Sequence, residues 1–488
     1  MEGFVKLCHS ALQLPMVQRI EALTITHADS RGLGRGAWTN SVGDVKRVIV
    51  PGTMPGDVVD VRIRRRKGGA LHGEVERCIS SERPRVDPFC SHFADCGGCT
   101  LQNFTYPDQL ALKEAMVRRA FDEVFSPGDG LPAIHPILPA PKQQRYRNKL
   151  EFSFGAHRWL REDEIAQLDQ IGDRRGLGFH VAGRFDRVLD LSECYLQGDP
   201  SEEIREFMRQ WSGSEGLTYY HPREHHGLLR LLIIRTSTTG ETMVTVMFGE
   251  NDDAGISNVM GALGERFPQL TELNYVVNTT QNDSIFPHAI KPWRGNGYIT
   301  ERCGPVKLRI RPKAFFQTNP EQAVALYARA LEMAHLHQTD RVYDLYSGIG
   351  SIALTLAPLV QEVIGIESIA DAVAAARENA TLNQCSNAHF EEGLVELVLP
   401  EVLKRRGRAD VIVVDPPRAG LHKNARQLLR SLEAPPRTLV YISCNPRTQA
   451  TDLHELQEHY AIVQMQPVDM FPQTRHVENI AILHRRGL

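Results

Sequence analysis

The chain has 488 residues, of which 42% are hydrophobic and 24% charged, and its formal net charge is -3. This balance is ordinary for a soluble globular protein of about three domains. No run of 18 or more apolar residues occurs, so no transmembrane helix is expected. The first residues hold one lysine and a short, interrupted apolar run, which excludes a secretory signal. We therefore expect a cytoplasmic protein whose nine cysteines are not disulfide-bonded.

After an N-terminal extension, residues 1–19, the segment 20–80 has the pattern of a small all-β domain. Val58–Ile63 alternates as a strand does, and Gly/Pro turn signals precede it. A dense basic tip follows, formed by Arg64, Arg65, Arg66 and Lys67. This tip is either a solvated turn or a loop that contacts phosphates. The layout resembles the TRAM domain, a β-barrel module that binds RNA.

The segment 81–310 mixes strands and loops and predicts an α+β middle domain that contains a cysteine cluster. Cys90, Cys96 and Cys99 lie close together in a glycine-containing loop, and Cys194 is the candidate for a fourth ligand. Four thiolates suit zinc or an iron–sulfur cluster. The presence of only one Cys-x2-Cys pair favours a 4Fe–4S cluster. Three thiols without a ligand are the alternative, although exposed loop cysteines invite oxidation.

From residue 311 to residue 488, short apolar β-type runs alternate with helical stretches. Such alternation predicts an α/β domain, namely a mostly parallel sheet with helices on both faces. Four of these runs are 341–346, 363–367, 409–415 and 438–443.

The first of these strands runs into a glycine loop with Asp344, Gly348, Gly350 and Ser351. Glycines let a ligand approach the backbone at the carboxyl end of a sheet. The next strand ends in Glu367, whose carboxylate can accept hydrogen bonds from ribose hydroxyls. A nicotinamide dinucleotide also fits this glycine spacing. The position of Asp344, four residues before the first glycine, favours S-adenosylmethionine and a Rossmann-like methyltransferase domain.

Two later strands end on residues with chemical potential. One delivers Asp415 to a stiff Asp-Pro-Pro turn, followed by Arg418 rather than an aromatic residue, which disfavours methylation of an exocyclic amine. A plain strand-end turn is the alternative. The other strand ends on Cys444, directly before Pro446 and a predicted helix. The helix N-terminus is expected to stabilise the thiolate. Core packing is the alternative reading of Cys444, and its position after the glycine loop and the Asp-Pro-Pro turn favours a nucleophile.

Methylation at C5 of uracil needs such a thiolate, because C5 does not attack a methyl group unaided. Addition of a thiolate at C6 gives an enolate with carbanion character at C5, which can attack a sulfonium methyl group. A base must then remove the C5 proton so that the thiol can leave. Glu478, at the start of the last strand pattern, is the candidate base, and a surface carboxylate is the alternative reading of this position.

Together these motifs resemble the RNA uracil-C5 methyltransferase family, in particular its iron–sulfur-containing branch that acts on 23S rRNA. The most specific segments are Phe315–Asn319, Asp344–Gly350, Asp415–Gly420, Ser443–Pro446 and His476–Glu478. The resemblance implies that Cys444 is the nucleophile, that Glu478 is the base and that Phe315 and Gln317 frame the target uracil. It also implies a 4Fe–4S cluster on the four cysteines. The cofactor contacts that it implies are Gln317, Tyr346, Glu367 and Asp415, and Glu392 is added as a guess for the adenine side.

The expected partner is RNA, with 23S rRNA as first choice and tRNA as second, and the expected oligomeric state is a monomer. The target uridine must be unpaired or flipped out, since C6 is inaccessible inside a helix. Candidate contacts to the RNA backbone are the basic residues 62–67 and Arg145, Arg147 and Lys149. Two other classes stay open, namely an iron–sulfur redox enzyme with a nicotinamide cofactor and a non-catalytic RNA-binding protein.

Overall fold

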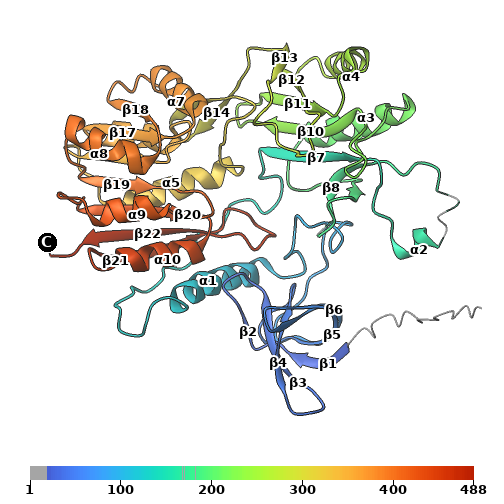
Figure 1. Cartoon of the computed structure of the whole chain (residues 1–488), viewed down its shortest axis with the longest axis horizontal. Helices are drawn as coiled ribbons and strands as arrows, with labels where there is room; N and C mark the ends of the chain where they lie inside the picture. Colours follow the sequence, from blue (N-terminus) through green and yellow to red (C-terminus); the bar gives the residue numbers. More distant parts are fainter. Residues whose placement is uncertain (1–18, 167–168, 170, 182, 488) are drawn as a thin grey trace, which may run out of the picture. The chain divides into compact units, whose positions relative to one another are not determined.

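The computed structural model describes residues 19–166, 169, 171–181 and 183–487 (Figure 1). Most of the N-terminal extension therefore lies outside the described residues. The chain divides into two compact units, one that ends at Arg85 and one that runs from Val86 to the C-terminus. No helix among the described residues is long and apolar enough to cross a membrane.

The first unit is a six-stranded sheet with the strand order β1-β5-β6-β4-β3-β2. Its core consists of inward-facing aliphatic side chains such as Ile20, Val48 and Val59. The strands are β1 (Arg19–Thr24), β2 (His27–Ala28), β3 (Gly34–Thr39), β4 (Val45–Val50), β5 (Val58–Lys67) and β6 (Ala70–Ser80). β5 and β6 are joined by Gly68 and Gly69, both with positive φ, so the basic tip is the end of a hairpin.

The second unit begins with a loop and helix α1 (Tyr106–Asp122), followed by a seven-stranded sheet with the order β13-β12-β11-β10-β7-β8-β9. The strands of this middle sheet are β7 (Lys149–Gly155), β8 (Gly176–His180), β9 (Val188–Asp190), β10 (Leu229–Thr236), β11 (Thr242–Phe248), β12 (Glu272–Val277) and β13 (Lys291–Arg294). Its helices are α2 (Glu162–Ile165), α3 (Ser201–Ser214) and α4 (Asp253–Arg266), and the hairpin β14 (Ile299–Cys303) and β15 (Val306–Ile310) follows.

The C-terminal part is a second seven-stranded sheet with the order β18-β17-β16-β19-β20-β22-β21, which confirms the predicted α/β class. The strands are β16 (Arg341–Leu345), β17 (Glu362–Glu367), β18 (Ala388–Glu392), β19 (Val411–Val414), β20 (Thr438–Ser443), β21 (Tyr460–Val468) and β22 (Glu478–Arg485). The helices are α5 (Pro320–Ala334), α6 (Ser351–Leu356), the short η2 (Ala357–Leu359), α7 (Ala370–Leu382), α8 (Val395–Arg406), α9 (Lys423–Arg430) and α10 (Pro446–Leu456).

The first five strands of this sheet are parallel, and β22 lies antiparallel between β20 and β21. The near-continuous aliphatic runs of these strands are what a sheet buried on both faces requires. The middle and C-terminal sheets have separate apolar cores, and Phe471 packs against both of them. The two sheets of the second unit are thus joined beside the segment that leads to β22.

Candidate functional site

The sheet topology brings the predicted chemical residues to one edge. Parallel strands present their carboxyl ends together, so the glycine loop, Glu367, Asp415 and Cys444 follow strand ends on the same side. β22 runs the opposite way and begins at this edge with Glu478. Ser443 of β20 is paired with Asn479 of β22 in antiparallel register. Cys444, which follows Ser443, therefore lies beside Glu478, which precedes Asn479.

The glycine loop is shaped by left-handed backbone at three positions. Gly348 and Gly350 have φ values of 54° and 87°, and Tyr346 adopts a φ of 68° despite its side chain. Such a conformation in a non-glycine residue costs free energy and is found preferentially at functional sites. The Gly348 amide donates a hydrogen bond to Glu367 Oε2 at 3.1 Å. A Cβ atom at Gly348 would meet nothing among the described residues within 4 Å, so the loop borders open space there.

Buried acceptors beside this loop have no hydrogen-bond partner among the described residues. They are both carboxylate oxygens of Asp344, the hydroxyl of Tyr346 and the hydroxyl of Ser347. Burial, together with the nearby Asp415 carboxylate, raises the pKa of Asp344 well above its usual range. Burial likewise raises the pKa of Asp415 to about 7. Buried acceptors and crowded carboxylates suit a polar ligand with positive charge, and these features fit S-adenosylmethionine.

The other predicted cofactor residues surround the same edge. Glu392 ends β18 opposite Glu367 and is exposed, and Ser351 opens helix α6. Gln317 is buried, whereas Phe315 is 70% exposed. An exposed aromatic ring two residues from a buried amide can stack on a base that the amide binds.

Cys444 lies half-buried between carboxylates and one guanidinium. Burial and the Glu478 carboxylate raise the pKa of the Cys444 thiol to about 11, while Arg418 acts in the opposite direction. Burial and Asp415 raise the pKa of Glu478 to about 8. Burial and the negative neighbours thus act against the stabilisation of the thiolate that is expected from the N-terminus of the following helix.

The strand ends around Cys444 are held in place by Asn445. Its side chain caps helix α10 by accepting from the Arg447 amide and donates to the Arg418 carbonyl at 3.0 Å. Thr448 also donates to that carbonyl, at 3.4 Å. The Asp-Pro-Pro-Arg turn and the cysteine turn are thereby tied together, so Arg418 stays beside Cys444 and Glu478.

Asn148, directly before β7, provides a second link, to the segment that carries Gln317, and no sequence pattern had indicated it. Its amide group donates to the Gln317 carbonyl at 3.2 Å, and its backbone N–H donates to the Thr318 carbonyl at 2.8 Å. Asn148 lies in a run of basic residues, where a polar side chain looks like part of a surface. Of the predicted RNA contacts in this run, Arg147 lies over the Phe471 ring and Lys149 pairs with Glu151, whereas Arg145 is exposed.

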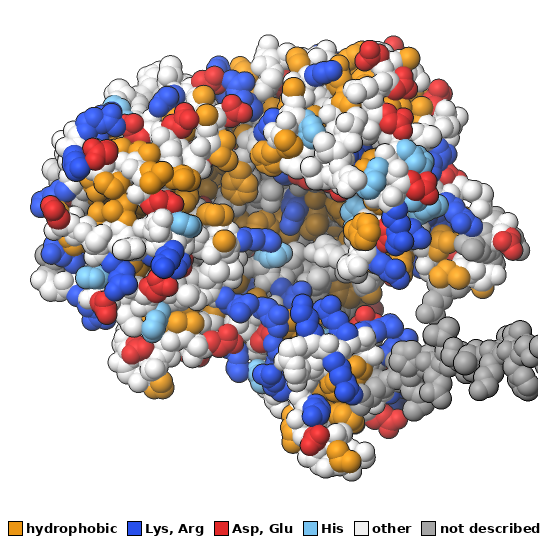
Figure 2. All heavy atoms as spheres, in the orientation of Figure 1, with side chains coloured by type: hydrophobic (Ala, Val, Ile, Leu, Met, Phe, Trp, Pro, Cys, Tyr) orange, Lys and Arg blue, Asp and Glu red, His pale blue; other side chains and the backbone are white. Residues whose placement is uncertain are grey.

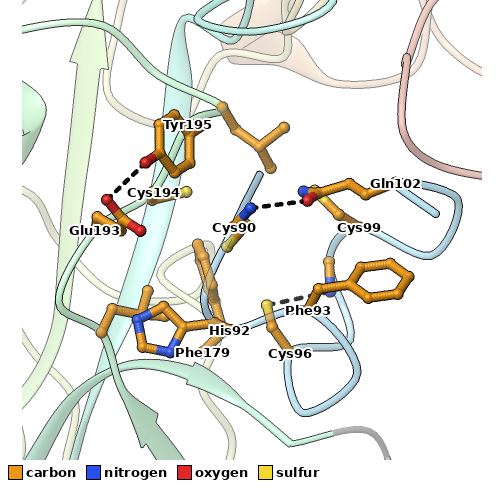
Figure 3. A pocket seen from close by; sticks show the side chains of 13 residues that line it. Cys90, His92, Phe93, Cys96, Cys99, Gln102, Phe179, Glu193, Cys194 and Tyr195 are labelled. Carbon is orange, nitrogen blue, oxygen red and sulfur yellow. Dashed lines mark hydrogen bonds between the residues drawn. The ribbon is translucent and has the colours of Figure 1, made fainter. Parts of the chain in front are cut away.

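The four predicted cysteine ligands line one cavity of the second unit. Figure 3 shows Cys90, Cys96, Cys99 and Cys194 around the same space, with apolar walls and His92 and Glu193 nearby. The Gly98 amide donates to Cys96 Sγ at 3.4 Å. Burial raises the pKa of Cys99 to about 11 and that of Cys194 to about 12.

Within the described ranges, no group of three or more His, Cys, Asp or Glu side chains has the arrangement that holds a metal ion. An iron–sulfur cluster makes a different demand, because its cysteines bind separate irons around a wider centre than one ion. Four thiols that line one cavity are the set of donor groups that such a cluster takes.

The basic hairpin tip of the first unit is exposed, and Arg64 there pairs with Glu74 at 2.7 Å. Figure 2 shows Lys and Arg side chains gathered on some parts of the visible surface and mixed with Asp and Glu on others. The net charge of -3 is therefore compatible with local basic regions.

Comparison with known proteins places these observations in context. Residues 305–486 match the family model described as tRNA (Uracil-5-)-methyltransferase. An RNA methyltransferase of Porphyromonas gingivalis is 41% identical over an alignment of 453 positions, and the match covers 90% of this chain and 95% of the relative. One of Bacillus cereus is 32% identical and covers 97% of this chain and 99% of its own length.

A solved structure resembles almost the whole chain. The tRNA (uracil-54, C5)-methyltransferase of Pyrococcus abyssi, in complex with S-adenosyl-L-homocysteine, superposes with a TM-score of 0.69 and 26% identity. The match covers 96% of this chain and 100% of the other. All of these matches are named as methyltransferases and give no support to the redox enzyme considered from the sequence.

Proposed function

Because the chain belongs to the RNA uracil-5-methyltransferase family, we propose that it methylates C5 of one uridine, with Cys444 as nucleophile and Glu478 as general base. The enzyme class, an S-adenosylmethionine-dependent methyltransferase, follows from the family itself. The observation that supports the two roles is the pairing of β20 with β22. It puts a thiol beside a buried carboxylate at the edge of the sheet that holds the glycine loop.

The reaction needs a nucleophile and a general base from the protein. The Cys444 thiolate adds to C6 of the uracil, which leaves negative charge on C5 and O4. When bound, S-adenosylmethionine supplies the electrophilic methyl group that C5 takes. Glu478 then accepts the C5 proton, the electrons of that C–H bond restore the double bond, and the Sγ–C6 bond breaks. Glu478 releases the proton to water, so methylated RNA, S-adenosylhomocysteine and a proton are the products.

The charges around Cys444 suit these reaction steps. Arg418 is the positive group that lowers the pKa of both Cys444 and Glu478. Burial and the carboxylates of Glu478 and Asp415 keep the Cys444 thiol protonated in the ligand-free protein, and Asp344 and Asp415 would offer negative charge to a bound cofactor that carries a positive charge. We infer that Asp344, Glu367 and Asp415 hold the cofactor, together with Gln317, Tyr346, Gly348, Gly350, Ser351 and Glu392.

We further propose that Cys90, Cys96, Cys99 and Cys194 bind a 4Fe–4S cluster, which the shared cavity supports. Iron and acid-labile sulfide, measured in protein purified without oxygen, should reach about four of each per chain. Zinc in place of iron, or neither metal in freshly purified protein, would contradict the proposal.

The proposed substrate is 23S rRNA, on the layout of the β-rich first unit and the cysteine cluster. The whole-length similarity to the P. abyssi tRNA enzyme makes tRNA the second candidate. The exposed basic hairpin tip, Arg64 to Lys67, is proposed to contact the RNA backbone, and Phe315 the target base.

One experiment tests nucleophile and substrate together. The protein is incubated with its cofactor and bulk RNA that contains 5-fluorouridine, which cannot lose fluorine as a cation. A protein–RNA adduct that survives denaturation is expected for the native chain and is absent for Cys444→Ala. Sequencing the trapped RNA names the substrate. An adduct that persists in Cys444→Ala would contradict the assigned nucleophile.

A further inference from the structure

The proposed base, Glu478, follows a segment that is not part of any strand. β21 ends at Val468, and residues 469–477 connect it to Glu478 at the start of β22. Most of this segment is nevertheless buried, and its backbone bends through a left-handed residue, Gln473, with a φ of 68°. A strained, buried connection persists only where its surroundings hold it, and those surroundings can be named.

The cysteine loop holds Gln473 directly. The Gln473 carbonyl accepts hydrogen bonds from the amides of Thr100, at 2.8 Å, and Leu101, at 3.0 Å. These two residues immediately follow Cys99. The backbone of the cysteine loop is therefore bonded to the segment that carries the base, five residues before Glu478.

Gln109 of helix α1 completes this joint from a fully buried position, with 1% of its surface exposed. Its Oε1 accepts from the Gln473 amide at 3.0 Å, and its Nε2 donates to Gln473 Oε1 at 2.9 Å. The same Nε2 group lies within hydrogen-bond distance of the carbonyls of Leu101 and Phe104, at 3.0 and 3.1 Å. One side chain thus links the cysteine loop to both the backbone and the side chain of Gln473.

Other buried groups fix the start of the segment. Lys113, also on α1, forms a fully buried ion pair with Asp469 and donates to the Phe471 carbonyl at 3.0 Å. Tyr106 donates to Asp469 at 2.9 Å, and Tyr146 donates to the Pro472 carbonyl at 2.9 Å. These contacts hold residues 469–472, which leaves the Gln109–Gln473 joint as the contact nearest to Glu478 among these anchors.

We propose that Gln109 is a positioning residue for the methyl-transfer reaction: through Gln473 it locks the cysteine loop to the segment that aims Glu478 at the target uracil. The proposal rests on the proposed function only in taking Glu478 as the base. On this proposal the cysteine loop contributes to catalysis by positioning the base, although no cysteine of that loop touches the reacting atoms.

The first test is Gln109→Leu, which keeps the volume of the side chain and removes all of its hydrogen bonds. Tyr219→Phe is the matched control, because it removes a buried hydroxyl contact with Ser212, at 2.6 Å, elsewhere in the same unit. We expect amide exchange of residues 473–478 to accelerate in Gln109→Leu alone. The turnover number should fall about tenfold to a hundredfold, while KM for the cofactor changes less than about threefold.

A pH profile separates positioning from general destabilisation. Glu478 faces Asp415, Arg418 and Cys444, and burial is the main reason for its raised pKa. A loosened segment admits water, so the rising limb of the rate profile should move to lower pH in Gln109→Leu and stay in place in Tyr219→Phe.

Gln473→Gly serves if Gln109→Leu does not fold, since glycine accepts the left-handed backbone and only the side-chain contact is lost. A smaller change in the same direction is expected. Unchanged amide exchange at residues 473–478, or equal losses in Tyr219→Phe and Gln109→Leu, would overturn the inference. Failure of the proposed function would look different: Glu478→Gln would then turn over normally, whatever Gln109 does to amide exchange.

Discussion

Two thiol sites of the second unit differ in their surroundings, although burial raises the pKa of the thiols in both. Cys444 lies among Glu478, Asp415 and Arg418, which are groups that can move or stabilise protons. The four clustered cysteines share a mainly apolar cavity, at whose wall His92 and Glu193 also lie. The raised thiol pKa therefore does not distinguish a nucleophile from a metal ligand, whereas the groups that surround each thiol do. These surroundings are the basis for proposing proton transfer at the first site and cluster binding at the second.

The largest expected effect is the loss of one site without damage to the other. Cys444→Ala should lower the turnover number by at least about 10⁴-fold, since the covalent route to C5 is closed. Binding of S-adenosylhomocysteine, measured by calorimetry, and the iron content should both stay within about twofold of the native values. Residual turnover near one-tenth of the native value would contradict the assigned role.

The reciprocal change acts on the proposed cluster. Cys194→Ser should abolish the visible absorption of the purified protein and lower the free energy of unfolding by about 3 kcal/mol or more, because metal-binding energy is folding energy. Cys385→Ser, a half-buried cysteine outside the cavity, is the control and should leave both unchanged. Equal behaviour of the two variants in absorption and denaturation curves would remove the distinction between the sites.

Asp344→Asn tests the cofactor half of the sheet edge. The carboxylate has no partner among the described residues and its pKa is raised, so the neutral amide should stabilise the ligand-free protein slightly. The affinity for S-adenosylmethionine should fall about tenfold to a hundredfold, because a charge-assisted contact is lost. Asp371→Asn, an exposed position on α7, is the control for both measurements. Unaltered affinity in Asp344→Asn would contradict the assignment.

The pH dependence of kcat/KM gives a smaller, graded effect. Glu478 must lose its proton before it can accept one from C5, and its pKa is about 8. Because the Cys444 thiol, with a pKa of about 11, must also lose its proton, the rate should rise about tenfold per pH unit above pH 8 and more steeply below it. Arg418 lowers the pKa of both Glu478 and Cys444, so Arg418→Gln should move the rising limb to higher pH. A flat profile between pH 6 and 8 would argue against Glu478 as the base.

The grouping of site residues at one edge of the C-terminal sheet could be predicted, because parallel strands have their carboxyl ends at the same edge. Glu367, Asp415 and Cys444 each follow an apolar run, so their proximity required no knowledge of side-chain contacts. The antiparallel course of β22 was not predicted, and it is what brings Glu478 beside Cys444.

Other features depend on contacts between segments far apart in the chain. Asn148 and Gln109 are polar residues in unremarkable surroundings, and only the fold reveals that both are buried and bonded to segments near the site. The left-handed backbone at Tyr346 and Gln473 is equally invisible, because neither residue type favours it. The raised pKa of Cys444 could not be predicted, since the effects of burial and two carboxylates cannot be weighed from sequence alone.

The central claim is that Cys444 attacks and Glu478 removes the proton, and Glu478→Gln tests it most directly. With cofactor and ordinary uridine-containing RNA, this variant should complete the first two steps and stop, because nothing takes the C5 proton. A denaturation-stable adduct should accumulate, with the transferred methyl group on the RNA, and it should be absent in Glu478→Gln combined with Cys444→Ala. Normal turnover by Glu478→Gln, or an adduct that forms without Cys444, would contradict the account.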